Sequence, residues 1–574
     1  MQPSSDQPVS NRNRQLKRWG PLIAIAVVVV VIVVIVAVAG GGGDDKKDET
    51  TGPGTGSSTP SGGPAGALTY AQAKADGSVD QHTFPHCDKS TGNVAMPYFF
   101  AAPCYADVKD NGGSTAPQGV TKDTITIGVY VAQESDAVLD YITQAINNND
   151  TNAQIKATYQ GYADMFNSLY QTYGRKVVLK FIDASGGSQD EVAARADAVK
   201  AADDLKVFAV WGGPVLTSAF ADELAARHVL CIGCTAGDPS FYTDRAPYLF
   251  SVAINQQQVQ DHVVEYIDKK LNGFKAKFAG SDDLKAKQRK FGYLWIESND
   301  DSKKSADRFV SKLKDDDIQL GANVSYTLDP SRLQEQATSA IAKFKQAGVT
   351  SIVFSGDPVA PSTFTKEATA QDYFPEWVLG PQALVDTNAF ARTYDQKQWA
   401  HAFGPSPLAT RFTPEEAPSF SLYKWFKGTN PPAIDTNPVL FPQPSLFFTG
   451  VQAAGPNLNV DTFKQGLFER PTQKQAVTQS YISFGRQGFW DYDDYNGGDD
   501  MTEVWWDPTA KGPDEIRKQG TGMWRFVDDG KRYLPGKWPK GESKAFEKAG
   551  SVTILDQPPA GERPKTYPSP AGGG

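Results

Sequence analysis

Residues 207–220, VFAVWGGPVLTSAF, carry the pattern that decides the fold of this chain. An apolar run from Val207 to Trp211 is followed by a glycine pair and then by Thr217 and Ser218. This order predicts a buried parallel strand, a tight turn and a helix that begins at a hydroxyl cap. The first N–H groups of a helix lack partners within it and lie at its positive dipole end, so a carboxylate binds well there. An ordinary β–α turn that binds no ligand has the same residues. The rest of the chain must therefore decide between a ligand-binding turn and an ordinary one.

The same alternation of strand and helix runs through most of the chain in two successive series. Strands are expected at 124–132, 176–183, 207–211 and 228–233, and again at 291–297, 319–328, 350–356 and 377–380. Strands that alternate with helices of about 10 to 15 residues indicate a parallel sheet with right-handed crossovers. A chain of 574 residues is also too long for one compact core. We therefore expect an α/β protein with two doubly wound parallel-sheet lobes, and a ligand in the crevice where they face each other.

The composition narrows the classes of function. The net charge of −9 includes a basic N-terminus, so the remainder is more acidic still. Nucleic-acid binding needs a clustered basic surface, and we expect no nucleic-acid partner. Five histidines and four cysteines are few for a metalloprotein of this size, and no cofactor is expected.

The N-terminus predicts export and a membrane tether. Residues 22–39, LIAIAVVVVVIVVIVAVA, form an uncharged apolar run, about 27 Å long as a helix and close to the roughly 30 Å hydrocarbon core. Basic residues precede the run and acidic residues follow it, so residues 1–20 should stay cytoplasmic and the bulk should lie outside. Ala37-Val38-Ala39 also fits a signal-peptidase site, and cleavage would release a secreted protein. Residues 40–66 are expected to be a disordered linker with an end-to-end distance of roughly 30 Å.

The four cysteines are interpreted in the light of export. A disulfide between Cys87 and Cys104 is the preferred prediction. The motif HTFPHC (82–87), followed by the distant Cys104, is also compatible with a metal site. Cys231 and Cys234 have the spacing of a redox pair. No thioredoxin-like context surrounds them, so a local disulfide or two reduced core thiols is the expectation.

Several stretches resemble the type I periplasmic-binding proteins of the branched-chain amino acid class, over roughly residues 119–510. They include GVTKDTITIGVYVAQES (119–135), YLFSVAINQQQ (248–258) and FFTGVQAAGPNLNVDTFKQGLFE (447–469). The family usually has a Tyr-Gly pair after the first strand of the second lobe, where this chain has Asp300 and Asp301. The resemblance implies two lobes joined by three crossover hinges that close on a small polar ligand. It also implies that the ligand is passed to the permease subunits of an ABC importer without chemical change, so no enzyme activity is expected.

The resemblance also suggests how the chain is divided. The expected parts are an N-terminal extension (67–118), a first lobe (119–252 with 386–480), a second lobe (253–385 with 481–540) and a loose C-terminal tail (541–574).

In members of that family, hydroxyls and backbone N–H groups after the first-lobe strands take the carboxylate of the ligand. Thr217 and Ser218 match these positions here, and acidic residues at second-lobe strand ends would pair with an ammonium group. The candidate ligand-binding residues are Gln133, Glu134, Ser135, Gly213, Thr217, Ser218, Thr235, Ala236, Glu297 and Asp357.

Other interpretations remain open at this stage. Glu297 and Asp357 also fit solvated loop acids, and Thr235 lies in a G-x-T-x-G that imitates the nucleophile elbow of a hydrolase. The acidic run 491–500 suggests calcium, but it lacks the EF-hand spacing, and an exposed acidic turn is expected instead. Nearby aromatic residues are expected to pack in the second lobe, or else to form a platform for a flat ligand. A ligand-sensing receptor ectodomain that acts with a signalling partner is the alternative to a transport protein.

Overall fold

The computed structural model describes residues 64–569 except 112–115, 137–138, 141–142, 144–147, 215, 235–236, 299, 330 and 381–383. The predicted basic tail, the predicted anchor and nearly all of the linker lie outside these residues. In the part of the chain that the structure describes, no helix combines the length and apolar character that a membrane span needs.

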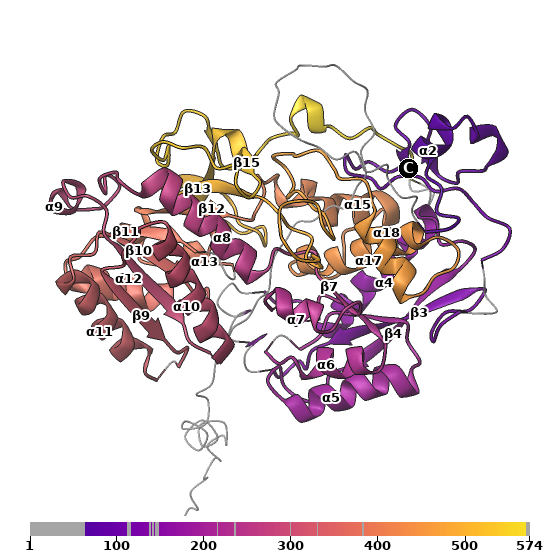
Figure 1. Cartoon of the computed structure of the whole chain (residues 1–574), viewed down its shortest axis with the longest axis horizontal. Helices are drawn as coiled ribbons and strands as arrows, with labels where there is room; N and C mark the ends of the chain where they lie inside the picture. The colour runs from indigo at the N-terminus through magenta and orange to yellow at the C-terminus, as the bar shows by residue number, and fades with distance from the viewer. Residues whose placement is uncertain are drawn as a thin grey trace, which may run out of the picture.

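The first lobe is built on a sheet of five parallel strands in the order β4-β3-β5-β6-β7 (Figure 1). The strands are β3 (Thr124–Val131), β4 (Lys176–Asp183), β5 (Ala209–Trp211), β6 (Leu230–Ile232) and β7 (Leu249–Phe250). The helices are α4 (Asn152–Leu169), α5 (Glu191–Val199), α6 (Ala219–Ala226), α7 (Pro239–Thr243), α15 (Pro418–Lys427), α16 (Asn437–Leu440), α17 (Pro442–Ala454) and α18 (Val460–Phe468). The quoted stretch supplies the fully buried central strand β5, as its continuous apolar run predicts.

The second lobe has a larger mixed sheet in the order β16-β14-β13-β12-β11-β10-β8-β9. Its strands are β8 (Phe291–Ile296), β9 (Ala322–Tyr326), β10 (Ser351–Ser355), β11 (Glu376–Leu379), β12 (Ala402–Ser406), β13 (Met501–Pro513), β14 (Gln519–Val527), β15 (Arg532–Tyr533) and β16 (Ser551–Val552). Strands β8 to β12 are parallel, and β13 to β16 extend the sheet in antiparallel fashion. The helices are α8 (Gln256–Tyr266), α9 (Asp282–Lys285), α10 (Asp300–Asp315), α11 (Leu333–Gln346), α12 (Pro361–Ala370), α13 (Asn388–Ala391) and α14 (Gln396–Trp399).

Both faces of the second sheet are covered. Along β8, Tyr293 and Trp295 pack in one apolar cluster with α8 and α10. Leu294 and Ile296 point to the opposite face and pack in a second cluster with α11 and α12. Successive strand residues alternate between the two clusters because side chains of a strand alternate in direction. The prediction of an α/β fold with parallel sheets is confirmed.

The chain passes between the lobes three times, and two of the predicted boundaries are wrong. The first crossover falls between Ala253 and Ile254, one residue from the expected position. The second follows β12, and not residue 385, because Ala402–Ser406 pairs with β11 and prolongs the second sheet. The third lies between Tyr495 and Met501, and not at 480, because the preceding aromatic segment packs on the first lobe. Between β11 and β12 the chain forms the short helices α13 and α14.

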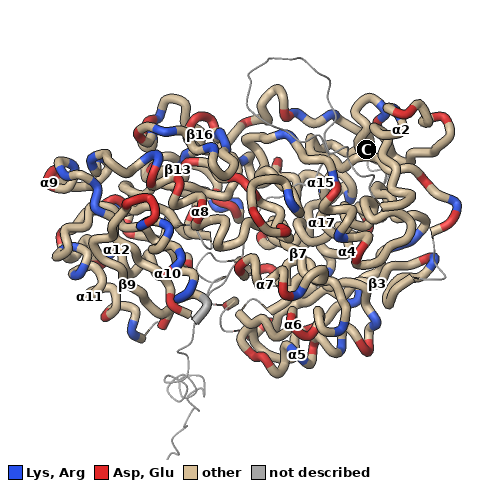
Figure 2. The backbone as a smooth tube through the Cα atoms, in the orientation of Figure 1, with Lys and Arg blue, Asp and Glu red and all other residues tan. Residues whose placement is uncertain are grey.

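The terminal segments are packed onto the lobes. In the N-terminal extension, α2 (Tyr70–Ala75) precedes the strands β1 (Cys87–Asp88) and β2 (Asn93–Val94). Residues from Val94 to Phe100 join the first-lobe core. The tail is not loose as predicted: Ser551–Val552 adds strand β16 to the second sheet, and Tyr567 then reaches the N-terminal extension. Basic and acidic residues are interspersed over both lobes (Figure 2).

Candidate functional site

The loop after β5 leads into α6, whose N-cap residue Ser218 makes no side-chain capping hydrogen bond, so the predicted hydroxyl contact to the helix comes from Thr217 one residue earlier. Thr217 is 9% exposed, and its Oγ1 accepts a hydrogen bond from the backbone N–H of Ala219 at 3.1 Å. The hydroxyl of Ser218 is exposed and donates to Asp222 Oδ2 at 3.0 Å. Both hydroxyls therefore lie at the start of α6, and each already has a partner within its own loop or helix.

Gly213 is required by the close approach of the next loop. A Cβ atom at Gly213 would lie 2.7 Å from the carbonyl oxygen of Cys234. Cys231 and Cys234 are in contact at the end of β6 and are placed as a local disulfide, which is one of the two states that the sequence left open. The predicted ligand residues Thr235 and Ala236 follow this disulfide and lie outside the described residues.

Three first-lobe loops are joined at the carboxyl edge of the sheet by Asp136, which the sequence did not single out. Asp136 is 3% exposed and accepts from the backbone N–H of Ser188 at 2.6 Å and from the Ser188 hydroxyl. The carbonyl of Ser188 in turn accepts from the N–H of Leu216 at 3.3 Å. Among the predicted residues that precede Asp136, Gln133 is half-buried, whereas Glu134 and Ser135 are exposed.

In the second lobe, Asp357 follows β10 and begins the loop that leads to α12. Its Oδ2 accepts from the Tyr326 hydroxyl at 2.6 Å, and its Oδ1 accepts from the N–H groups of Val359 and Ala360 at 2.8 Å each. Burial raises the pKa of Asp357, and these hydrogen bonds oppose the rise. Because both carboxylate oxygens already have partners, Asp357 has little capacity left for an ammonium group.

Among the described residues, none forms a hydrogen bond or ion pair with the Glu297 carboxylate, so this group can bind a cation. Glu297 follows β8, which is the neighbour of β10, and its side chain is half-buried. Its backbone N–H donates to the carbonyl of Tyr326 at 2.8 Å. Tyr326 therefore contacts both predicted acidic residues. The sequence analysis did not name Tyr326, and its place near the end of an expected strand was the only indication that it lies at this edge of the sheet.

Leu216 connects the two halves of the site. It belongs to the first-lobe loop between β5 and α6, yet its side chain packs against the apolar core of the second lobe. The carboxyl end of the central first-lobe strand therefore faces the second lobe. This arrangement brings the Thr217 hydroxyl to the boundary between the lobes.

The acidic run 491–500 is not the exposed turn that its composition predicts. Asp494, Asp499 and Asp500 are at most 1% exposed. Gln258 donates to Asp494 at 2.7 Å, and Ser483 and Trp490 donate to Asp499 at 2.5 and 2.9 Å. Burial raises the pKa of Asp494, and burial together with the nearby Asp494 charge raises that of Asp499. Within the described residues, no group of three or more His, Cys, Asp or Glu side chains has an arrangement that would hold a metal ion.

The aromatic residues near this run divide between the lobes. Trp505 and Trp506 pack in the second-lobe clusters, as expected. Tyr495 packs in the first-lobe core instead, because the third crossover begins after it.

Comparison with known proteins identifies the fold. No family model matches the chain, and no curated protein matches its sequence. The ABC transporter substrate-binding protein from Sphaerobacter thermophilus is similar in structure, with a TM-score of 0.50 at 12% identity over 72% of this chain and 99% of that one. The substrate-binding protein of a branched-chain amino acid transporter from Streptococcus pneumoniae, in complex with isoleucine, has a TM-score of 0.46 at 15% identity, over 70% and 99% of the chains. A fatty acid ABC transporter substrate-binding protein from Thermomonospora curvata has a TM-score of 0.45 at 13% identity, over 71% and 93%. This chain has the α/β fold of the type I periplasmic-binding proteins.

Proposed function

We propose that this chain is an extracytoplasmic solute-binding protein that captures a small polar molecule, amino-acid-like or related, and delivers it to an ABC importer. The observation that carries the proposal is the packing of Leu216 against the second-lobe core. It sets the start of α6 against the opposite lobe, where a ligand would contact both walls at once. The fold supports the proposal, because the similar solved structures are substrate-binding proteins of ABC transporters.

The proposed mechanism is hinge closure about the three crossovers. A ligand shifts the balance between open and closed lobes only if it binds the closed state more tightly. The Thr217 hydroxyl and the N–H groups at the start of α6 would take a carboxylate, and Glu297 would take an ammonium group. Asp357 would hold the loop after β10 in shape and would not contact the ligand.

Titration with a metabolite library tests the ligand site. A ligand present at 100 times its Kd should raise the free energy of unfolding by about 2.7 kcal/mol, which a shift in Tm reports. The double change Thr217→Ala and Ser218→Ala should weaken binding at least tenfold. The control is Thr69→Ala, which removes the N-cap hydroxyl of α2 in the N-terminal extension, outside the proposed site. Equal affinities of the double variant and the control would remove these residues from the site.

We further propose that residues 21–39 anchor the protein, with the lobes outside the cytoplasm and the permease subunits as partners in the same membrane. The uncharged apolar run and the preceding basic residues support this placement. Protease added to intact cells should degrade the lobes, and the chain should sediment with membranes. A soluble product whose N-terminus follows Ala39 would show cleavage instead.

A further inference from the structure

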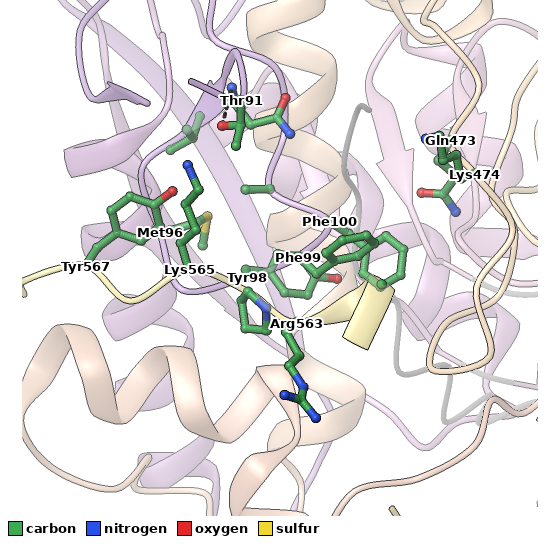
Figure 3. Close-up of a pocket in the computed structure, with 15 residues that line it drawn as sticks. Thr91, Met96, Tyr98, Phe99, Phe100, Gln473, Lys474, Arg563, Lys565 and Tyr567 are labelled. Carbon is green, nitrogen blue, oxygen red and sulfur yellow. Dashed lines mark hydrogen bonds between the residues drawn. The ribbon is translucent and has the colours of Figure 1, made fainter. Parts of the chain in front are cut away.

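A cavity open to solvent lies away from the proposed solute site. It has a volume of about 340 Å³ and is lined by the N-terminal extension, the segment after Arg470 and the C-terminal tail (Figure 3). Its lining residues are Thr91, Asn93, Val94, Met96, Tyr98, Phe99, Phe100, Ala101, Gln473, Lys474, Gly561, Arg563, Pro564, Lys565 and Tyr567. None of the residues of the proposed solute site belongs to this set.

Aromatic rings form one wall of the cavity. Phe99 and Phe100 meet edge to face with ring centroids 4.9 Å apart, and Tyr98 meets Phe100 at 5.8 Å. Phe99 is 36% exposed, and among the described residues only one other large apolar side chain is classed as exposed. A phenylalanine open to a concave site offers apolar surface that a ligand would remove from water.

The charged residues that line the cavity are all basic. Lys474, Arg563 and Lys565 line it, and none of the fifteen lining residues is acidic. The lining of the cavity is therefore basic, although the whole chain has a net charge of −9. Lys565 is partly neutralised by Asp88, 2.9 Å away, whereas Lys474 and Arg563 make no ion pair with a described residue.

A buried guanidinium adds to this positive potential. Arg470 is 9% exposed, and its Nε has no hydrogen-bond partner among the described residues. The groups that interact with its charge are the phenols of Tyr98, Tyr105 and Tyr170. Of these three tyrosines, Tyr98 also lines the cavity.

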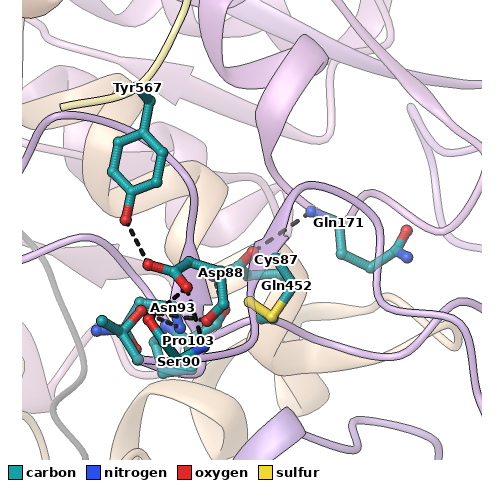
Figure 4. The surroundings of a disulfide bond; sticks show 10 residues. Cys87, Asp88, Ser90, Asn93, Pro103, Gln171, Gln452 and Tyr567 are labelled. Carbon is teal, nitrogen blue, oxygen red and sulfur yellow. Dashed lines mark hydrogen bonds between the residues drawn. A yellow bond between two sulfur atoms is a disulfide. The ribbon is translucent and has the colours of Figure 1, made fainter. Parts of the chain in front are cut away.

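The walls of the cavity are tied in place. The Cys87–Cys104 disulfide, predicted from the sequence, closes the base of the extension (Figure 4). Tyr567 on the tail donates to Asp88 at 2.7 Å, beside this disulfide. Glu562 on the tail accepts from the N–H of Val477 at 3.0 Å, and Tyr98 donates to Gln479 at 2.8 Å. The cavity is therefore held by contacts between three separate parts of the chain.

We infer that this cavity binds a small organic anion with an aromatic body, as a site distinct from the one between the lobes. The aromatic body would lie against Phe99 and Phe100, and the carboxylate would face Lys474 and Arg563. A volume of about 340 Å³ is at the lower end of the range for small-molecule pockets, which suits a ligand of one or two rings.

Binding of 2-naphthoate to the whole protein, followed by isothermal titration, tests the inference. Its neutral isostere 2-naphthamide should bind at least tenfold more weakly. The change Phe99→Ser, and the double change Lys474→Gln with Arg563→Gln, should each weaken naphthoate binding at least tenfold. Lys537→Gln with Lys540→Gln is the matched control, because it removes the same charge from exposed second-lobe residues that do not line the cavity and should leave binding unchanged.

Each contrary outcome overturns the inference. Equal binding of acid and amide, no naphthoate binding at millimolar concentration, or unchanged affinity in either cavity variant would do so. Loss of naphthoate binding in the Thr217→Ala and Ser218→Ala variant would place the anion between the lobes. Capture of the protein by anionic vesicles through Phe99, without binding of free naphthoate, would identify a lipid surface instead. Unchanged near-ultraviolet circular dichroism of the variants excludes misfolding.

Discussion

Arg532 is the residue at which two of the three crossovers meet. Its side chain is 1% exposed, and its Nε donates to Asp500 Oδ1, at the end of the third crossover, at 2.9 Å. Its Nη atoms donate to the carbonyls of Pro407 and Leu408, in the second crossover, at 2.9 and 2.8 Å. One guanidinium thus joins the second crossover at Leu408 to the third crossover at Asp500, 92 residues later in the chain.

Replacement of Arg532 by Ala should lower the free energy of unfolding by about 3–5 kcal/mol, because Asp500 would then be a buried charge without its partner. Urea denaturation measures the loss. The change Arg486→Ala is the matched control, since Arg486 pairs with Asp493 at the surface, and it should cost at most about 1 kcal/mol. A similar cost for both variants would show that Arg532 does not hold the crossovers.

At the scale of elements, the segment that enters the third crossover is held by buried carboxyl groups. Asp494 accepts from Gln258 in α8, so it links this segment to the first helix of the second lobe. His262, in the same helix, contacts the carbonyl of Asp499 and accepts from Trp538. Burial lowers the pKa of His262, which keeps the ring neutral in this network.

The raised pKa of Asp494 makes the stability of this element depend on pH. The folded state binds the proton more tightly than the unfolded chain, whose aspartates titrate near 3.8. The stability that protonation contributes is complete below that value and is lost as the pH rises through the raised pKa. Between pH 5 and pH 8 the free energy of unfolding should therefore fall less in the Asp494→Asn variant than in the wild type. The difference between the two slopes should be at most about 1.4 kcal/mol for each pH unit.

Urea midpoints at a series of pH values provide the measurement. The Asp491→Asn variant is the control, because Asp491 is an exposed residue of the same segment and should follow the wild-type profile. Parallel profiles for the wild type and both variants would show that Asp494 is ionised in the folded protein.

At the scale of the whole molecule, the turn between β13 and β14 reaches from the second lobe to the first. Arg517 in this turn pairs with Asp435 at 2.6 Å and also donates to the carbonyl of Ile434. The neighbouring Ala433 belongs to the first-lobe core. This contact is therefore sensitive to any change in the relative position of the lobes.

If closure accompanies ligand binding, the Asp435→Asn variant should bind the ligand about two- to fivefold more weakly, because the closed state loses part of an ion pair. Isothermal titration measures the affinity, and small-angle scattering reports a larger radius of gyration without ligand. The control is Asp164→Asn, which removes a partly exposed ion pair with Lys427 inside the first lobe. An Asp435 variant that matches this control would show that the pair does not move with closure.

The sequence by itself determined the alternation of strands and helices up to β11, the first crossover to within one residue and the start of α6 beside Thr217. These features depend on patterns within about twenty residues: apolar runs, the glycine pair and the Thr217 hydroxyl. Only the tertiary structure decided the place of β12, the extension of the second sheet and the packed tail, because their partners are far away in the chain. The same holds for the carboxylates. Asp357 was predicted to bind a ligand, but it is buried and accepts a hydrogen bond from Tyr326. Asp494 was predicted to lie in an exposed turn, but it is buried and accepts a hydrogen bond from Gln258. An acidic residue is stable inside a protein only where such donors converge, and local sequence does not specify that convergence.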